Sequence, residues 1–91
     1  MLKNTSDGVI VLCPVCASEY THHINTKVYE RLNGEDGQTV VLTPGLGELE
    51  QSDFNPSKRR NAVAIEFQGE CGHFFTMYVV QHKGVTYIQF P

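Results

Sequence analysis

The segment Cys13-Pro14-Val15-Cys16 is the feature of the sequence that most restricts how the chain can fold. Two thiolates separated by two residues can bind one metal ion, because the intervening turn brings both sulfurs to the same side. Pro14 fixes its own φ angle and so favours this turn. A thioredoxin-like redox pair would require a helix that starts at the motif, whereas the residues after Cys16 lead into a strand-like segment. The motif therefore indicates a metal site.

The segment Cys71-Gly72-His73 offers the further ligands of a closed zinc site, which needs about four. It lies between two segments with strand patterning, as the first motif does, so two strand-turn-strand units can hold one ion between them. Gly72 adds no side-chain bulk and permits an unusual backbone angle. Three thiolates and one imidazole favour tetrahedral Zn²⁺ over iron or an iron–sulfur cluster. We therefore predict one structural Zn²⁺ bound by Cys13, Cys16, Cys71 and His73.

The fourth ligand has competitors among the other histidines. His22 and His23 lie on opposite faces of the strand expected after the first motif, and either is an alternative to His73. His82 is expected at the surface beside a turn, and Glu70 is expected to be solvated or hydrogen-bonded to its own turn.

The length of 91 residues predicts a single domain over residues 1–91. A chain of this size buries only about 60–65% of the surface that its unfolded form exposes, so such domains commonly use a metal or a disulfide. The three cysteines are an odd number, which favours metal ligation. Structural zinc contributes about 10–16 kcal/mol in small peptides, which is comparable to the net stability of a whole domain.

The net charge of −3 does not favour nucleic-acid binding by the molecule as a whole. The charges are unevenly distributed, however, because segment 34–56 contains acids but no Lys or Arg, and Lys58-Arg59-Arg60 follows soon after. These three residues form either a local patch for nucleic acid or a group that only keeps the protein soluble.

The N-terminal residues contain an apolar run of only four residues, Val9 to Leu12. That run is too short for a signal peptide or a membrane span. We therefore expect a cytoplasmic protein with no membrane partner.

Alternation of apolar and polar residues predicts a mainly β domain, a small antiparallel sheet of about five strands with two metal-binding turns. The expected strands cover residues 9–12, 20–32, 38–43, 61–68, 74–81 and 85–90. Residues 33–37 predict a hairpin turn, and residues 44–60 are expected as one long mobile loop. Residues 74–80 are apolar on both faces, which is typical of a central strand covered on both sides. No segment has helical periodicity over ten residues.

The two motifs and the strands around them resemble the zinc-ribbon and rubredoxin-like knuckle proteins, and more closely small uncharacterised zinc-ribbon-like proteins of bacteria and their phages. The similar stretches are residues 13–31, CPVCASEYTHHINTKVYER, and residues 59–90. The resemblance implies that Cys13 and Cys16 are ligands and that a second ligand pair lies around Cys71. Two features depart from the family pattern: Ala17 stands where Gly usually follows the second Cys, and a shorter segment replaces the second C-x-x-C.

These observations favour a zinc-stabilised binding module that contacts a protein or nucleic acid, because the resemblance implies no activity. One alternative is a zinc-dependent hydrolytic enzyme with an open metal position, with Cys13, Cys16 and Cys71 as ligands and Glu70 as base. A zinc deaminase would need helices and the reverse motif order. Another alternative is an accessory subunit of a larger complex, held through an exposed strand edge near the C-terminus.

Overall fold

The fold is built from β-strands, and the computed structural model describes residues 2–32, 37–58 and 60–91. The strands are β1 (Leu2–Thr5), β2 (Gly8–Val11), β3 (Thr21–Arg31), β4 (Thr39–Thr43), β5 (Glu48–Ser52), β6 (Ala62–Gly69), β7 (Phe74–His82) and β8 (Val85–Gln89). Within these ranges no residue is helical. The mainly β fold class predicted from the sequence is confirmed.

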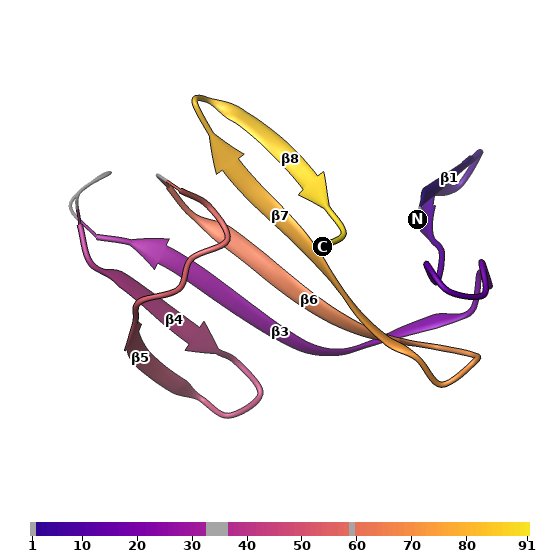
Figure 1. The fold of residues 1–91 in the computed structure, drawn as a ribbon, viewed down its shortest axis with the longest axis horizontal. Coiled ribbons are helices and arrows are strands. Elements are labelled where there is room, and N and C mark those ends of the chain that lie inside the picture. The colour runs from indigo at the N-terminus through magenta and orange to yellow at the C-terminus, as the bar shows by residue number, and fades with distance from the viewer. Residues whose placement is uncertain (1, 33–36, 59) are drawn as a thin grey trace.

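Six of the strands form one antiparallel sheet in the order β5-β4-β3-β6-β7-β8 (Figure 1). The long β3 lies at its centre and pairs with β6 on one side and β4 on the other. This central pair joins the N-terminal and C-terminal halves of the chain. It also brings the start of β3 beside the end of β6, at Thr21 and Gly69.

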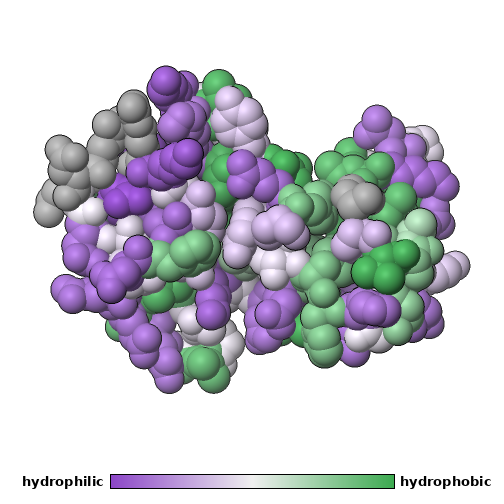
Figure 2. Space-filling view, in the orientation of Figure 1, coloured by the Kyte–Doolittle hydropathy of each residue, from purple (hydrophilic) through white to green (hydrophobic). Residues whose placement is uncertain are grey.

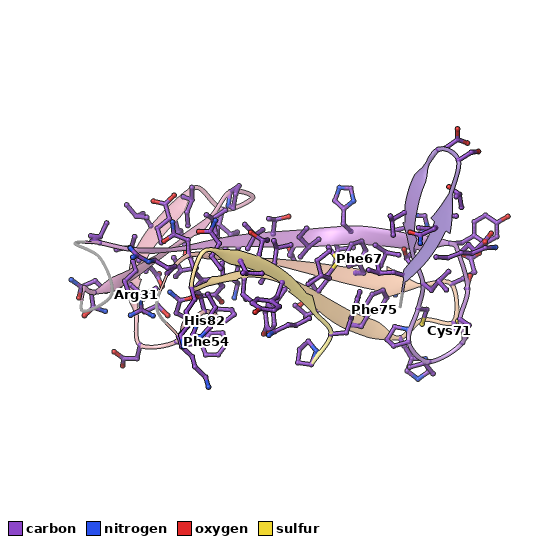
Figure 3. The ribbon with its side chains drawn as sticks, turned by 90° about the horizontal axis from the view of Figure 1, so that it is seen from above. Arg31, Phe54, Phe67, Cys71, Phe75 and His82 are labelled. Atoms are coloured by element: carbon purple, nitrogen blue, oxygen red, sulfur yellow. The ribbon has the colours of Figure 1, made fainter. Side chains whose placement is uncertain are left out.

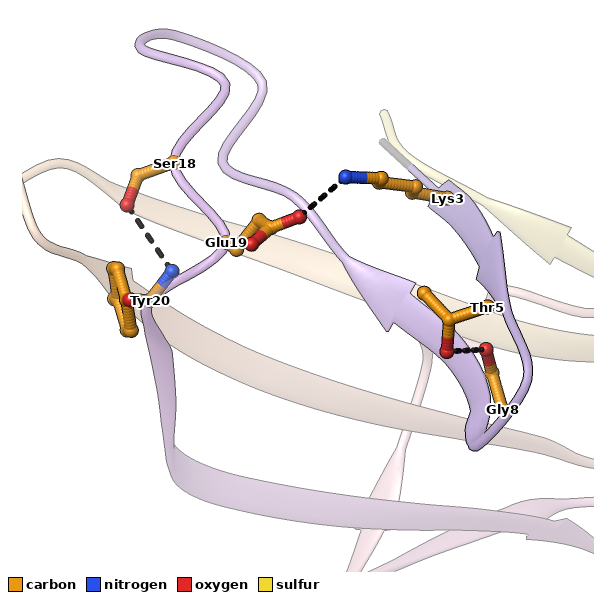
Figure 4. A network of polar contacts seen from close by, with 6 residues as sticks. All are labelled: Lys3, Thr5, Gly8, Ser18, Glu19 and Tyr20. Atoms are coloured by element: carbon orange, nitrogen blue, oxygen red, sulfur yellow. Dashed lines mark hydrogen bonds and ion pairs between the residues drawn. The ribbon is translucent and has the colours of Figure 1, made fainter.

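The first two strands form a separate hairpin at the end of the molecule away from β4 and β5 (Figure 1). Lys3 Nζ lies 2.7 Å from a carboxylate oxygen of Glu19, which ties the hairpin to the chain just before β3 (Figure 4). The Thr5 hydroxyl donates to the Gly8 carbonyl and stabilises the hairpin turn. The hairpin thus positions the residues that follow β2, which include Cys13.

The largest cluster of buried residues lies on one face of the six-stranded sheet. It is formed by Tyr29, Ala62, Ala64 and Val80, with Val41 and Tyr78 packed against them. Phe54, from the β5–β6 connection, covers this face, and its ring meets that of Tyr29 edge-on at 5.7 Å. Seen edge-on, Phe54 and His82 lie on the same side of the sheet (Figure 3). The β5–β6 connection therefore acts as a partial second layer.

Polar contacts hold the β5–β6 connection on the sheet. Ser57 is 2% exposed and its hydroxyl donates to the Gln81 carbonyl of β7. Arg31 Nη2 donates to the Ser57 carbonyl at 3.1 Å, and Asn55 Nδ2 donates to the Thr39 hydroxyl at 3.2 Å. The connection is thereby attached to three strands.

Surface hydropathy differs along the molecule. On the side seen in Figure 2, hydrophilic residues predominate over β3 to β5, and hydrophobic residues gather toward the N-terminal hairpin. No helix among the described residues is long and apolar enough to cross a lipid bilayer.

The six predicted strands are confirmed with small shifts at their ends, and two further strands were missed. Glu48–Ser52 forms β5, so the prediction of one loop over residues 44–60 is wrong for this part. An edge strand pairs through its backbone and needs little apolar sequence, which is why β5 gave no signal. The predicted turn over residues 33–37 lies mostly outside the described residues. Lys83 and Gly84, in the turn between β7 and β8 beside His82, have positive φ angles.

The prediction that β7 is covered on both sides holds only in part. Met77 and Val80, on opposite faces of the strand, are buried, whereas Phe74 at its start is 64% exposed. In β3, the register shifts between His23 and Asn25, so the strand carries a bulge at Ile24 that was not predicted. Because of this bulge His22 and Asn25 share a face, and a simple period of two fails there.

Candidate metal centre

Three sulfur atoms from two distant bends converge at the end of the sheet near the N-terminal hairpin. Cys13 and Cys16 lie in the first bend, residues 13–18 after β2, and Cys71 lies in the second bend, residues 69–73 between β6 and β7. The three Sγ atoms lie within 4.8 Å of one another. Cys13 Sγ and Cys71 Sγ are 3.6 Å apart, close to the roughly 3.8 Å expected of two thiolates bound to one tetrahedral Zn²⁺. The arrangement can therefore hold a metal ion.

The first bend is closed by two backbone hydrogen bonds. The Cys13 N–H donates to the Ser18 carbonyl at 3.1 Å, and the Ala17 N–H donates to the Cys13 carbonyl at 2.8 Å. Ala17 has a φ of 60°, a left-handed conformation that L side chains rarely adopt. The alanine at this position therefore retains the conformation for which a glycine would be usual.

The second bend repeats this pattern in a shorter form. The Gly69 N–H donates to the His73 carbonyl at 2.9 Å, and the Gly72 N–H donates to the Gly69 carbonyl at 2.9 Å. Gly72, directly after Cys71, has a φ of 87°, as Ala17 has a positive φ directly after Cys16. In this comparison Cys71 corresponds to Cys16, and Gly69 takes the position of Cys13.

Gly69 makes room for the site. A Cβ atom at this residue would lie 2.9 Å from Cys13 Sγ and 3.6 Å from Cys71 Sγ. Real Cβ atoms do not approach a sulfur so closely, so a larger residue at position 69 would displace the Cys13 side chain. The sequence alone gave no sign of this role, because Gly69 lies at the end of a strand and outside both motifs.

The first bend lowers the pKa of Cys13 to about 7. The largest cause is the backbone N–H of Cys16, which points at the sulfur and stabilises the thiolate. Burial opposes this shift, while the N–H of Val15 and the thiols of Cys71 and Cys16 support it. Cys13 is also 1% exposed, so the thiolate that forms first lies at the inside of the cluster.

Cys71 shows the opposite shift. The backbone N–H of His73 favours its thiolate, but the thiols of Cys16 and Cys13 and burial together raise the pKa of Cys71 above its ordinary value. Three neighbouring sulfurs resist carrying three negative charges at once. A cation between them would remove that repulsion.

His73 lies beside the three cysteines. Its Nδ1 is 3.2 Å from Cys71 Sγ, but it is not among the groups whose ligand atoms all lie within 4.8 Å of one another. His22 is exposed in β3, opposite Gln68, and the ring of His23 packs edge-on against Phe67 at 6.3 Å. His82 lies at the end of β7, beside the turn to β8. Among the histidines that the structure describes, His73 is the one whose ring lies at hydrogen-bond distance from a cysteine of the cluster.

The exposure of the cluster is uneven. Cys13 is buried, whereas Cys16 and Cys71 are exposed, and all three are free thiols. A bound ion would therefore be shielded on the side of Gly69 and accessible on the other. Comparisons with protein-family models, with curated proteins and with solved structures found no match to this chain.

Proposed function

We propose that the chain is a zinc-binding module in which Cys13, Cys16, Cys71 and His73 hold one structural Zn²⁺. The observation that carries this proposal is the convergence of cysteine sulfurs from bends 58 residues apart. The free thiols and the lowered pKa of Cys13 support ligation by thiolates. Thiols that stay reduced also fit the cytoplasmic location expected from the sequence.

The proposed fourth ligand is His73. It directly follows Gly72, the residue with positive φ in the second bend, and so lies in the same bend as Cys71. Its Nδ1 already lies at hydrogen-bond distance from Cys71, so a change of side-chain torsion would bring the ring toward the ion. Three thiolates and one imidazole then satisfy the ordinary coordination of structural zinc.

A stabilising role fits the surroundings better than catalysis. Among the described residues the buried polar side chains are Thr39 and Ser57, and neither is an acid or a base. Glu70, the base of the enzymatic alternative, is exposed, and its backbone N–H donates to the Tyr20 carbonyl. The ion would instead fasten the β6–β7 turn to the start of β3, so that a sheet face or loop is presented to a partner protein.

Metal analysis of the purified full chain tests the proposal. We expect one zinc per chain in the wild type and in His22→Ala, and a loss of tightly bound zinc in Cys13→Ser, Cys71→Ser and His73→Ala. His22→Ala is the matched control, since His22 is an exposed histidine at the start of β3. Loss of zinc in His22→Ala but not in His73→Ala would reassign the fourth ligand. A wild-type chain that folds and takes up no metal would refute the whole site.

A zinc-dependent hydrolytic enzyme is the second candidate, favoured by the exposure of Cys16 and Cys71. An open coordination position would admit water or a small anion. The visible spectrum of the Co²⁺-substituted protein distinguishes the two roles. A closed four-ligand site keeps its spectrum when azide is added, and an open site changes it.

Contact with nucleic acid is a further version of the binding role. Lys58 and Arg60 are exposed in the β5–β6 connection, and Arg59 lies outside the described residues. Binding through these residues would weaken steeply as the salt concentration rises. An affinity that is independent of salt would leave a protein partner, or an accessory role in a larger complex, as the proposed function.

A further inference from the structure

One face of the six-stranded sheet carries a continuous aliphatic row. Residues that pair directly across neighbouring strands share a face, and the registers align one aliphatic residue from every strand. The aliphatic row consists of Leu49, Leu42, Val28, Val63, Val79 and Ile88, in the order of the strands from β5 to β8. Tyr29 follows Val28 in β3 and Ala62 precedes Val63 in β6, so the core cluster around Tyr29 and Ala62 lies on the opposite face. Phe67 and Met77, which are also buried, share the face of the row farther along β6 and β7.

The aliphatic row is uncovered in the single chain. Leu49 is 67% exposed, Ile88 51% and Leu42 39%, and the three valines between them are partly exposed. The β5–β6 connection lies on the other face, over Tyr29 and Tyr78. In the described chain the principal contacts between strands are those of sheet neighbours, so neither the N-terminal hairpin nor another strand forms a second layer over the row.

The charges of the sheet are separated between its two faces. By the strand registers, the core face carries the charged strand residues Lys27, Arg31, Glu48, Glu50 and Glu66. Among the paired strand residues on the face with the aliphatic row, Glu30 is the charged one. A face with so little charge offers no electrostatic complementarity to a charged partner. The partner surface that fits this face is therefore an apolar one.

We infer that the aliphatic row is the interface of a homodimer, in which two chains pack face to face as a β-sandwich. A second copy supplies a matching uncharged apolar row, and a two-fold axis brings the same patch of both chains together. Stacked sheets pack about 10 Å apart with their inner side chains interdigitated. Each chain thereby gains the second layer that a sheet with an apolar face requires.

The size of the face meets the requirement of a stable dimer. Six strands about 4.8 Å apart cover roughly 29 Å, and this face carries two residues in each of β4, β5 and β8 and three or four in each of β3, β6 and β7, which span roughly 14–20 Å along the strands. The projected area is then on the order of 500 Å² per chain, or about 1,000 Å² for the pair, which reaches the minimum expected of a specific interface.

Sedimentation equilibrium of the full chain, loaded with zinc, tests the dimer. We expect a dimer for the wild type and a dissociation constant at least about tenfold higher for Leu49→Lys and for Ile88→Lys. Both residues are already more than half exposed in the single chain, so lysine there leaves the folding of the monomer intact. Circular dichroism and zinc content confirm that each variant is folded.

Leu46→Lys is the matched control, because Leu46 is 70% exposed and lies in the β4–β5 turn, away from the row. We expect this variant to dimerise like the wild type. A monomeric wild type would overturn the inference. A dimer that Leu49→Lys leaves unchanged would also overturn it, since that result is expected of edge-to-edge pairing through β8. Equal weakening by Leu46→Lys would show that the row is not the interface.

Discussion

At the scale of single residues, the candidate metal centre depends on backbone positions as much as on the cysteines. The residues after Cys16 and Cys71 both have positive φ, and Gly69 leaves the space that the Cys13 sulfur occupies. The ligand residues are visible in the sequence because their chemistry is specific. The supporting residues are not, because their role arises only when the two bends meet.

Gly69→Ala should weaken zinc binding without removing a ligand. The added Cβ would lie 2.9 Å from Cys13 Sγ and 3.1 Å from Cys13 Cβ, so the Cys13 side chain would have to shift. We expect at least a tenfold loss of zinc affinity, about 1.4 kcal/mol or more, measured by competition with a chromophoric chelator. Gly45→Ala is the control, because a Cβ there meets nothing within 4 Å. Equal affinity in both variants would show that the second bend adjusts freely.

The lowered pKa of Cys13 predicts a pH dependence of the metal-free protein. A thiol whose pKa falls on folding, here from 9.0 to about 7, stabilises the folded state fully above the unfolded-state pKa, and this contribution is lost as the pH falls through about 7. The raised pKa of Cys71 acts in the opposite sense at higher pH.

We therefore expect one thiolate to titrate near pH 7 in the reduced, metal-free protein, followed by its ultraviolet absorbance. Cys13→Ser should abolish this step, and Cys16→Ser should retain a step at shifted pH because the backbone N–H of residue 16 remains. If a thiolate still forms near pH 7 in Cys13→Ser, the step does not belong to Cys13, and the assignment of the lowered pKa to this residue is wrong.

At the scale of elements, the sequence predicted the strands in which apolar and polar side chains alternate. It did not predict strands that are held mainly by backbone hydrogen bonds. β6 and β7 were predicted well because Val63, Ile65 and Phe67 alternate with smaller or polar residues. β5 was missed because an edge strand buries little. The bulge at Ile24 in β3 was not predicted, because a local shift of register leaves no trace in a period of two. Likewise, the covering of Tyr29 by Phe54 is a contact between distant segments that no local pattern encodes.

Ser57→Ala should loosen the β5–β6 connection. Ser57 is 2% exposed, and its hydroxyl donates to the Gln81 carbonyl and accepts from the Arg60 N–H at 2.9 Å, so the substitution removes both hydrogen bonds. We expect a loss of about 1–3 kcal/mol in the free energy of unfolding, measured by urea denaturation. The exposed neighbour Lys58→Ala should change it by less than about 0.5 kcal/mol. A similar small effect of both variants would mean that the connection is not held by Ser57.

At the scale of the whole molecule, the candidate metal centre and the β5–β6 connection lie at opposite ends of a thin sheet. The core between them is small, with seven buried apolar residues among those described. A bound structural zinc contributes about 10–16 kcal/mol in small peptides, against a usual net stability of about 5–15 kcal/mol for a domain. The metal is therefore proposed as a major part of the stability of this chain.

A chelator should lower the melting temperature of the wild type strongly, and added Zn²⁺ should restore it. Thermal unfolding followed by circular dichroism measures both changes. Cys71→Ser, which lacks one ligand, should melt at a low temperature that the chelator hardly alters. An unchanged melting curve of the wild type after complete removal of metal would contradict a stabilising role.

The separation of 58 residues between Cys13 and Cys71 also bears on the order in which the chain folds. During synthesis the first bend is complete long before Cys71 emerges, so an ion held there early would keep a vacant coordination position. The arrival of Cys71 would then close the loop of 58 residues that separates it from Cys13 and align β6 with β3 in a single event. Loop closure over such a separation is slow and entropically costly for a free chain. An ion already bound at the first bend would bind Cys71 when the two bends meet, and this added interaction would stabilise the closed loop.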